Sequence, residues 1–402
     1  MKKSRINIQT DIFSYIQIFF SAIFRSKKII NKFRYELQNF FKTKNLIITS
    51  QGRSACYFIL CHLISNKKKK ILISPFTLPE VIHSIFYAGG IPVYVDIDIK
   101  TGLPKIDDLE KLIASDTAAI IITHLYSNES NILQFKKYFF NKIPIIEDVA
   151  INFGAKLEKN KPLGTIFDYG FCSFGIMKNL STLNGGLLIV KDKKNFNKIL
   201  INYESKLTQY PLLPALKLIY FCILIDIFYN KIIFNYFTYY LIKFLIEKKI
   251  LAFEKFIYPG LYPKRFVNAP KNYFFNFFQS FAYLGLENLK KLNNQLLYRK
   301  KKVLLYEKYL NKKLLISNYK NYDENVFLEF PILLKKNSSK SISLKLYERG
   351  YDIRHTWYLD NSRSKVKNCA IAQKYILCLP THNNIFERDI KKISDIINNL
   401  EN

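Results

Sequence analysis

The sequence predicts an α/β protein with a mostly parallel central sheet and helices on both of its faces. Between residues 46 and 190, short apolar runs alternate with helical stretches, as in a sheet built from strand–helix–strand units. The chain has 402 residues and is 49% apolar, which is enough for a sizeable core and for more than one domain. Polar residues suited to ligand binding follow several of the apolar runs, where parallel sheets bind their ligands.

The expected elements run in order from the N-terminus. Residues 6–44 alternate apolar and basic side chains at helical spacing, which predicts amphipathic helices lying on the core, with a lipid surface as the alternative. Strands are expected at 46–49, 71–74, 93–96, 118–123, 143–147 and 187–190, with a further apolar segment at 169–174. Helices are expected at 56–64, 78–88, 106–114 and 131–140.

The end of the chain has a different pattern, which predicts a smaller α+β domain. Helices are expected at 285–310, 341–350 and 385–400, and strands at 326–334, 353–358 and 375–379. We therefore predict four parts: an N-terminal helical segment (1–45), a large α/β domain (46–204), a hydrophobic helical insertion (205–270), and a connecting helix with the small domain (271–402).

The insertion is dense in Ile, Leu, Phe and Tyr over residues 207–257, but charged residues interrupt its uncharged runs. This pattern predicts two helices around a turn near Asn230. They can lie in an anionic membrane interface, or they can form a dimer interface or a core insertion. A tilted transmembrane helix over 218–242 is the less favoured alternative, because Asp226 and Lys231 fall inside it.

Composition limits the class of partner and the compartment. Lys and Arg number 62 against 31 Asp and Glu, a net charge of +31. No nucleic-acid-binding motif accompanies this charge, so we predict no nucleic-acid partner. The six Cys are scattered without metal-ligand spacing, which indicates buried thiols in a cytoplasmic protein and no metal site. We also expect no secretory signal, because the apolar stretch 12–24 lacks a small-residue cleavage site.

A pair of acidic residues and a lysine suggest the chemistry. Glu147 and Asp148 end one strand, and Lys178 lies between two apolar segments before the turn Asn184-Gly185-Gly186. A pyridoxal phosphate enzyme needs a Lys that carries the cofactor as a Schiff base and an acid that keeps the ring nitrogen protonated. A surface Lys and a helix-capping Asp are the alternative reading of the pair.

A Gly and small hydroxyl residues stand between the first strand and the first helix of the large domain, at 50–55 (SQGRSA). Free N–H groups at such a helix start suit a phosphate, although an ordinary helix N-cap looks the same.

Taken together, these motifs resemble the DegT/DnrJ/EryC1/StrS family of pyridoxal phosphate-dependent sugar aminotransferases, which have the fold type I architecture. The motifs that carry the resemblance are SQGRSA (50–55), the run 74–98, HLYSNESNI (124–132), IIEDVAINFGA (145–155), SFGIMKNLSTLNGG (173–186), LGLENLKKL (284–292) and LCLPTH (377–382).

The resemblance implies roles for single residues. Lys178 matches the Schiff-base lysine, Asp148 the acid on the ring nitrogen, and Ser173 a phosphate-binding hydroxyl. Gly52, Arg53 and Ser54 match the phosphate loop, with Arg53 where the family usually has Thr. His124, Arg354 and His355 are weaker candidates for substrate contacts, and Asn272 or Asn276 for a phosphate contact supplied by a partner subunit.

Several positions depart from the family pattern. Ile151 replaces a common Gln, Phe153 a common His, and Leu78 a ring-stacking aromatic, while Leu183-Asn184 stands where Gly-Glu is usual. We expect Ile151 and Phe153 to make the cofactor pocket drier, which affects turnover more than cofactor binding.

The resemblance implies transfer of an amino group from glutamate to a nucleotide-linked keto-sugar, for surface polysaccharide synthesis, by a cytoplasmic homodimer that is either free or at the inner membrane face. One alternative is a protein with this fold and weakened catalysis that serves as a membrane-associated binding or scaffold component. Sugar dehydration, in which this family replaces the Lys by His, is opposed by Lys178.

Overall fold

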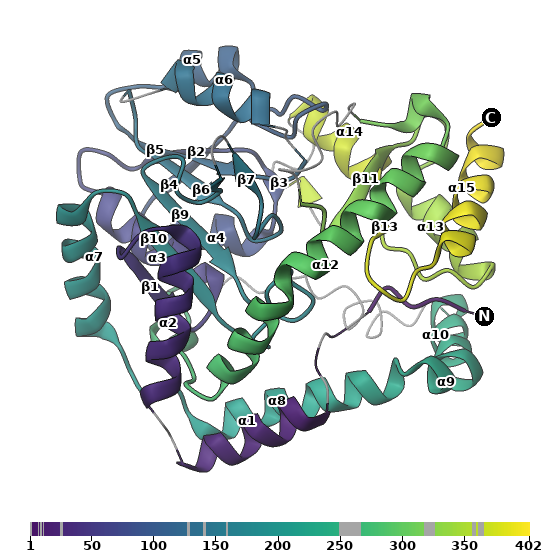
Figure 1. Cartoon of the computed structure of the whole chain (residues 1–402). Coiled ribbons are helices and arrows are strands. Elements are labelled where there is room, and N and C mark those ends of the chain that lie inside the picture. The colour runs from purple at the N-terminus through teal and green to yellow at the C-terminus, as the bar shows by residue number, and fades with distance from the viewer. Residues whose placement is uncertain are drawn as a thin grey trace.

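The computed structural model describes residues 2–402 except 7, 9, 11, 25–26, 127–128, 140–141, 158–159, 249–266, 317–325, 356–358 and 361–365. A large sheet lies on one side of the molecule and a smaller C-terminal layer on the other (Figure 1). The long helix α12 (Phe281–Tyr309) runs between them.

The central sheet has seven strands in the order β1-β10-β9-β6-β5-β2-β4. Strand β10 is antiparallel to both of its neighbours, and the other described pairings in this sheet are parallel. The strands are β1 (Leu46–Thr49), β2 (Lys70–Ile73), β4 (Ile91–Tyr94), β5 (Thr117–Thr123), β6 (Ile145–Asp148), β9 (Tyr169–Ser173) and β10 (Gly186–Val190). The predicted fold class, a mostly parallel sheet with covered faces, is confirmed.

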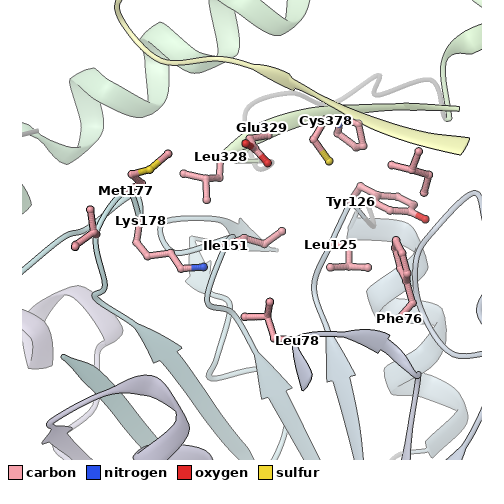
Figure 2. A pocket seen from close by; sticks show the side chains of 13 residues that line it. Phe76, Leu78, Leu125, Tyr126, Ile151, Met177, Lys178, Leu328, Glu329 and Cys378 are labelled. Carbon is pink, nitrogen blue, oxygen red and sulfur yellow. The ribbon is translucent and has the colours of Figure 1, made fainter. Parts of the chain in front are cut away.

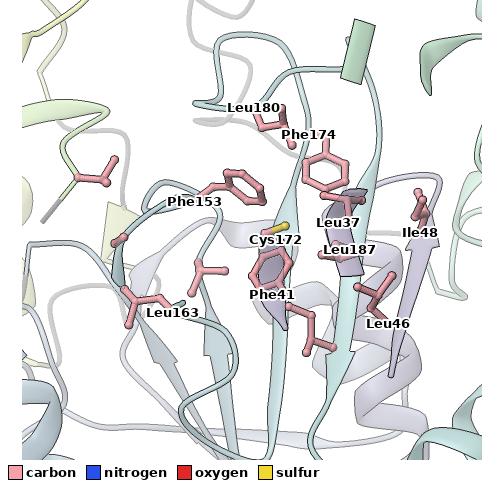
Figure 3. Close-up of a cluster of buried hydrophobic side chains, with 14 of the residues drawn as sticks. Leu37, Phe41, Leu46, Ile48, Phe153, Leu163, Cys172, Phe174, Leu180 and Leu187 are labelled. Carbon is pink, nitrogen blue, oxygen red and sulfur yellow. The ribbon is translucent and has the colours of Figure 1, made fainter. Parts of the chain in front are cut away.

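Helices cover both faces of the sheet, which explains why its strands are apolar on both sides. Neighbouring residues of β1 show the alternation: Ile47 packs in one buried cluster with Phe58 and Tyr203, whereas Ile48 packs in another with Phe41. Figure 3 shows Leu37 and Phe41 among the side chains of that second cluster. The covering helices are α2 (Lys27–Phe41), α3 (Gly52–Leu63), α4 (Pro79–Tyr87), α5 (Ile106–Leu112), α6 (Glu129–Phe139) and α7 (Lys193–Lys206).

The C-terminal layer pairs two antiparallel strands, with Pro331 opposite Cys378. Its strands are β11 (Glu329–Leu333) and β13 (Ile376–Pro380), and its helices are α13 (Ser339–Glu348), α14 (Lys367–Tyr375) and α15 (Glu387–Glu401). The small pairs β3 (Phe76–Thr77) with β12 (Leu359–Asp360), and β7 (Lys156–Leu157) with β8 (Lys161–Pro162), complete the strands. Two short 3₁₀ turns lie at Lys271–Phe274 and Lys312–Leu314.

The four predicted parts remain a prediction, but most of their elements are confirmed. The strand predicted at 353–358 is not seen in its described residues: residues 352–354 have no regular structure, and His355 forms only an isolated bridge with Leu377. Residues 356–358 lie outside the described part of the chain. The strand predicted at 143–147 is present but shifted: β6 spans Ile145–Asp148, so it begins later than predicted and includes Asp148.

The insertion forms the predicted helix pair. Helix α8 (Leu212–Phe228) ends before Asn230, whose side chain accepts a hydrogen bond from the Ile232 N–H and starts the next helical run. That run comprises α9 (Lys231–Ile233), a π-helical turn (Phe234–Thr238) and α10 (Tyr239–Glu247). Residues 249–257 of the predicted segment lie outside the described residues.

Among the described helices, none is by itself long and apolar enough to cross a membrane. The two arms of the insertion meet that requirement only together, and they are bent by 56°. The alternative of one tilted helix over 218–242 is therefore wrong, because the chain turns at Tyr229 and Asn230. Helix α1 (Ile12–Phe24) packs against α8 along one edge of the molecule (Figure 1).

Candidate active site

A cavity of about 80 Å³ lies between the carboxyl edge of the central sheet and the C-terminal strands β11 and β13. Apart from Lys178 and Glu329 its lining is almost wholly apolar or aromatic: Phe76, Leu78, Leu125, Tyr126, Ile151, Ile176, Met177, Leu328, Pro331, Ile376 and Cys378. Figure 2 shows Lys178 reaching into this space, with Glu329 on the opposite wall. Both halves of the molecule therefore build the site.

Lys178 is held by the connection between β9 and β10. Its N–H donates to the Gly175 carbonyl at 3.2 Å. The next residue, Asn179, is buried and donates from its amide to the carbonyls of Ile151, at 3.1 Å, and Phe153, at 3.3 Å. The lysine loop is thus fixed to the loop that follows Asp148.

The preceding residue, Met177, has φ of 69°, a left-handed conformation that is uncommon for residues other than glycine. Such strained backbone persists where the surrounding structure requires it and is frequent at functional sites. Here it turns the chain so that the next side chain, Lys178, enters the cavity.

Burial controls the charge of Lys178. It lowers the pKa of this ammonium group from its usual value, because a charged group is poorly solvated in an apolar environment. The carboxylates of Asp148 and Glu329 act in the opposite direction, and Arg354 adds to the lowering. The result is an amine that loses its proton more readily than a lysine in water.

Asp148 ends β6 and is 5% exposed. Its Oδ1 accepts a hydrogen bond from the Ala150 N–H at 3.0 Å. Burial raises the pKa of this carboxyl, while the Ala150 N–H, Lys178 and His124 oppose the rise. A buried carboxylate of this kind gains stability from a cationic N–H partner.

The neighbouring acid, Glu147, points elsewhere. Its two carboxylate oxygens accept backbone N–H groups from Gly164, Ile166 and Phe167, at 2.8 to 2.9 Å. His124 Nε2 lies 3.0 Å from Glu147 Oε2, and both side chains are fully buried. His124 is thus not among the residues of the cavity wall, and its role as a substrate contact stays a prediction.

The predicted phosphate loop is built by close backbone packing at the ends of β1, β9 and β10. A Cβ on Gly52 would lie 2.9 Å from the Ser173 Cβ, and a Cβ on Gly186 would lie 2.5 Å from the Gly52 nitrogen. Helix α3 begins here without a side-chain cap, since Gln51 makes no capping hydrogen bond. An uncapped helix start leaves N–H groups that can bind an anion.

The hydroxyl groups of the loop have partners within the chain. Ser50 Oγ lies 3.1 Å from Ser54 Oγ and donates to the Asn272 carbonyl at 2.9 Å. Ser173 Oγ accepts from the Gly175 N–H at 3.3 Å. None of these residues lines the cavity itself; they lie at neighbouring strand ends.

Arg53 is engaged by other side chains. Its Nε donates to the Gln51 amide oxygen at 2.7 Å, and its NH1 nitrogen lies 3.7 Å from Glu80 Oε1. A contact of the Arg53 guanidinium with a phosphate would therefore require this cluster to rearrange.

The remaining predicted contacts fall in different places. Arg354 is buried and close enough to Lys178 to lower its pKa. His355 is partly buried, and burial lowers its pKa to about 4. Within this chain, the side chain of Asn276 accepts from the Tyr210 N–H, and Asn272 offers its carbonyl to Ser50.

Two of the family departures line the cavity, whereas Phe153 and Leu183-Asn184 do not. Leu78 and Ile151 are part of its wall. Phe153 instead stacks on Phe40, with ring centroids 5.1 Å apart, and packs against Phe174 in the core. The expectation that Phe153 dries the pocket is wrong, whereas Ile151 does give it an apolar wall.

Sequence reasoning missed Glu329, Met177 and Asn179. Glu329 begins β11 and faces the cavity, about 150 residues from Lys178. The available signal was an acidic residue at the start of an apolar strand. For Met177 and Asn179 the only signal was their position beside Lys178.

The donor set fits pyridoxal phosphate. Lys178 presents an amine with a lowered pKa to the cavity, and Asp148 is a buried carboxylate at the adjacent strand end. The uncapped helix start at Gly52 lies against Ser173, because only a glycine allows this approach: a Cβ on Gly52 would lie 2.9 Å from the Cys172 carbonyl oxygen. In the described residues no group of three or more His, Cys, Asp or Glu could hold a metal ion.

Comparison with known proteins gives one family match. The model described as the DegT/DnrJ/EryC1/StrS aminotransferase family matches residues 9–205. A GDP-perosamine synthase from Escherichia coli O157:H7 is 30% identical over 152 residues, 38% of this chain and 42% of that protein. The chain spans less than half the length of the first curated relatives that it matches.

Similar solved structures extend over the whole chain. Helicobacter pylori PseC, described as an aminotransferase involved in the biosynthesis of pseudaminic acid, has a TM-score of 0.72 and 17% identity, covering 100% of this chain and 99% of its own. An E. coli GDP-4-keto-6-deoxy-D-mannose-3-dehydratase with bound hydrated PLP has a TM-score of 0.72 and 16% identity, covering 99% and 100%. At these identities the likeness is one of fold, and the predicted fold type I architecture is confirmed.

Proposed function

Because this chain belongs, through residues 9–205, to the DegT/DnrJ/EryC1/StrS aminotransferase family, we propose that it is a pyridoxal phosphate-dependent aminotransferase. It moves an amino group from glutamate to a nucleotide-linked keto-sugar used in surface polysaccharide synthesis. The observation that carries this proposal is the desolvated Lys178 amine, which faces an apolar cavity beside the buried Asp148.

The residues of the chain divide the work. When bound, pyridoxal phosphate supplies an aldehyde that joins to amines and a ring that withdraws electrons. Lys178 Nζ would hold that aldehyde, and as a neutral amine it would move the substrate proton. Asp148 would keep the ring nitrogen protonated, and the Gly52–Ser54 helix start with Ser173 would hold the phosphate.

The apolar wall has a role in this scheme. Leu78, Leu125 and Ile151 exclude water around Lys178 Nζ. With little water present, the amine stays neutral between proton transfers and the carboxylate of Asp148 acts more strongly on a ring N–H. Where the family commonly has a polar Gln side chain, Ile151 instead excludes water from the cavity.

The acceptor is proposed from the relatives and from charge. The GDP-perosamine synthase is named for a nucleotide sugar, which supports a nucleotide-linked acceptor here. A net charge of +31 favours a ligand that carries a diphosphate. Glutamate is proposed as the donor, with Arg354 and His355 near the site as candidate carboxylate or sugar contacts.

The assembly and the compartment follow the same reasoning. We propose a homodimer in which residues of the 272–276 segment reach the partner's phosphate loop. The Asn276 side chain is already bound to the Tyr210 N–H, whereas Asn272 contacts Ser50 only through its backbone carbonyl. The Asn272 side chain is therefore the better candidate of the two for the contact with the partner's phosphate. The six cysteines are free thiols, which supports a reducing compartment such as the cytoplasm.

The test begins with covalent attachment. Purified protein incubated with pyridoxal phosphate and reduced with borohydride should retain the cofactor on the peptide that contains Lys178, as read by mass spectrometry. Lys178→Ala should lose this label, and the control Lys193→Ala, on the surface of α7, should keep it. Unchanged labelling of Lys178→Ala would show that the assignment is wrong.

The second candidate is a protein with this fold and weakened catalysis that serves as a membrane-associated scaffold. The engagement of Arg53 by Gln51 and Glu80, and the apolar Ile151 and Leu78, favour it. Adding glutamate to the loaded protein separates the two: an active enzyme loses its lysine-bound cofactor absorbance and then aminates a nucleotide keto-sugar. A scaffold binds the cofactor without either change.

A further inference from the structure

Helices α1, α8 and the run α9–α10 leave an apolar surface that nothing in the described chain covers. More than half of the large apolar side chains exposed in the described residues lie on these helices. Phe13 is 73% exposed, Tyr220 64% and Tyr236 82%. We call the outer faces of these helices the apolar edge; they lie along one border of the molecule (Figure 1). Soluble proteins seldom expose so many neighbouring apolar groups without a partner.

The inner faces of these helices already pack against the rest of the protein. The exposed side chains of the apolar edge are therefore a separate surface and not part of an unfilled core. Tyr15 and Ile18 of α1, and Ile219 of α8, are buried. The Tyr15 hydroxyl donates to Asp226 Oδ2 at 2.5 Å, which locks α1 to α8. Helices that are apolar on both faces need a second apolar environment on the outside.

The α10 arm is fixed in the same way. The rings of Tyr239 and Tyr347 stack with centroids 4.9 Å apart, and each hydroxyl donates to the other residue's carbonyl. Lys2 Nζ donates to the Tyr240 hydroxyl at 2.6 Å and ties the N-terminus to the same arm. The outward side chains Phe237 and Phe244 therefore project from a rigid support.

Charge identifies the occupant. Lys217, Lys231 and Lys248 are exposed on these helices. The acid within α8, Asp226, faces inward to Tyr15, and Glu247 lies 3.8 Å from Lys243. The homodimer proposed above uses the 272–276 segment, and a second copy paired through the apolar edge would place these lysines against each other. An anionic bilayer instead attracts the lysines and accepts the aromatic rings at its interface.

We propose that the apolar edge docks the protein onto an anionic membrane, with α1, α8 and α9–α10 lying in the plane of the lipid interface. The bend of 56° between the two arms gives a broad two-directional footprint rather than a span. The proposal rests on the surface alone and stands independently of the aminotransferase assignment.

The test is co-sedimentation of the full chain with vesicles of phosphatidylglycerol or of phosphatidylcholine. Parent protein should bind phosphatidylglycerol more tightly, and high salt should weaken that binding. The triple change Tyr236→Ser, Phe237→Ser and Phe244→Ser should weaken it by about tenfold or more, because three exposed rings lose their apolar environment. Replacing Lys217, Lys231 and Lys248 by Gln should remove the lipid preference, at about fivefold per lysine.

The matched control changes exposed apolar residues elsewhere: Tyr35→Ser, Ile201→Ser and Leu297→Ser. It should bind vesicles as the parent does. The proposal is overturned if the parent does not bind phosphatidylglycerol at low salt, or if the ring variant binds as the parent does. A ring variant that turns a dimer into a monomer, from a parent that ignores vesicles, would instead identify the edge as an interface between copies. The circular dichroism spectrum and its thermal unfolding serve as the fold control in each variant.

Discussion

Lys178 combines a strained turn, an apolar wall and two carboxylates that act on one amine. Only the neutral amine attacks an aldehyde, so the rate of cofactor attachment should rise with pH through the pKa of Lys178 and then level off. Burial lowers that pKa, so the midpoint should lie below that of a solvent-exposed lysine, about 10.4. Stopped-flow absorbance with Nα-acetyl-lysine as the reference gives this comparison.

The variant Glu329→Gln tests the electrostatic effect of Glu329 on the pKa of Lys178. The Glu329 carboxylate favours the charged form of Lys178, so its removal should move the midpoint to lower pH. A midpoint that stays in place or rises would contradict the assigned electrostatics.

At this scale the sequence predicted Lys178 and Asp148 as site residues, because strand ends and a Gly-Gly turn frame them. It could not tell which of the adjacent acids Glu147 and Asp148 faces the ligand side. Strand alternation predicts only that the two point to opposite sides. Glu147 proved to be held by three backbone N–H groups, a role that depends on residues 164–167 folding back under the strand.

Helices α1 and α8 are joined by the polar pair of Tyr15 and Asp226. Burial raises the pKa of Asp226 to about 6, well above its usual 3.8, so the folded state holds the proton more tightly than the unfolded chain. Stability from this site is therefore fully present below about pH 4 and is lost as the pH rises through about 6. Asp226→Asn keeps an acceptor for Tyr15 and removes the ionisation.

The expected result is a variant that melts at a higher temperature than the parent at pH 8, with a difference that shrinks toward pH 5. Thermal unfolding followed by circular dichroism measures both curves. The exposed acid of α15 supplies the comparison, since Asp395→Asn should leave the pH dependence as it is in the parent. Identical pH dependence in the parent and in Asp226→Asn would rule out this assignment.

Elements were predicted well where apolar periodicity was strong, as for β1 and the helix pair around Asn230. The strand predicted at 353–358 failed, because an apolar run carries no information about whether a neighbouring strand is present to pair with it. The position of α1 against α8 was also beyond the sequence. Their contact joins residues about 200 positions apart through a buried Tyr and Asp.

Arg299 joins helix α12 to the C-terminal layer. It is buried on α12 and its NH1 nitrogen donates to the Leu328 carbonyl at 2.7 Å and to Thr381 Oγ1 at 2.8 Å. Leu328 and Glu329 form the cavity wall opposite Lys178, although Arg299 does not line the cavity. Burial lowers the pKa of this guanidinium to about 10, and Glu329 opposes the shift.

Arg299→Met should therefore destabilise the fold and also weaken cofactor binding from a distance. It leaves two buried acceptors without their donor, which costs about 2–4 kcal/mol in the free energy of unfolding. Urea denaturation and a pyridoxal phosphate titration measure the two effects. The control Lys301→Met changes an exposed side chain two residues further along the same helix. It should change the free energy of unfolding by less than about 0.5 kcal/mol. Full cofactor affinity in Arg299→Met would show that the wall does not depend on α12.

Helix α12 touches both sides of the site. Near its start Asn288 donates to the Ser181 carbonyl in the loop after Lys178, and farther along Arg299 holds the opposite wall. A helix of 29 residues is a rod of roughly 43 Å. A tilt of a few degrees about Asn288 would move the far end of this rod by a couple of ångströms. Because α12 contacts the lysine loop at Asn288 and the chain before β11 at Arg299, such a tilt would move these two segments relative to each other.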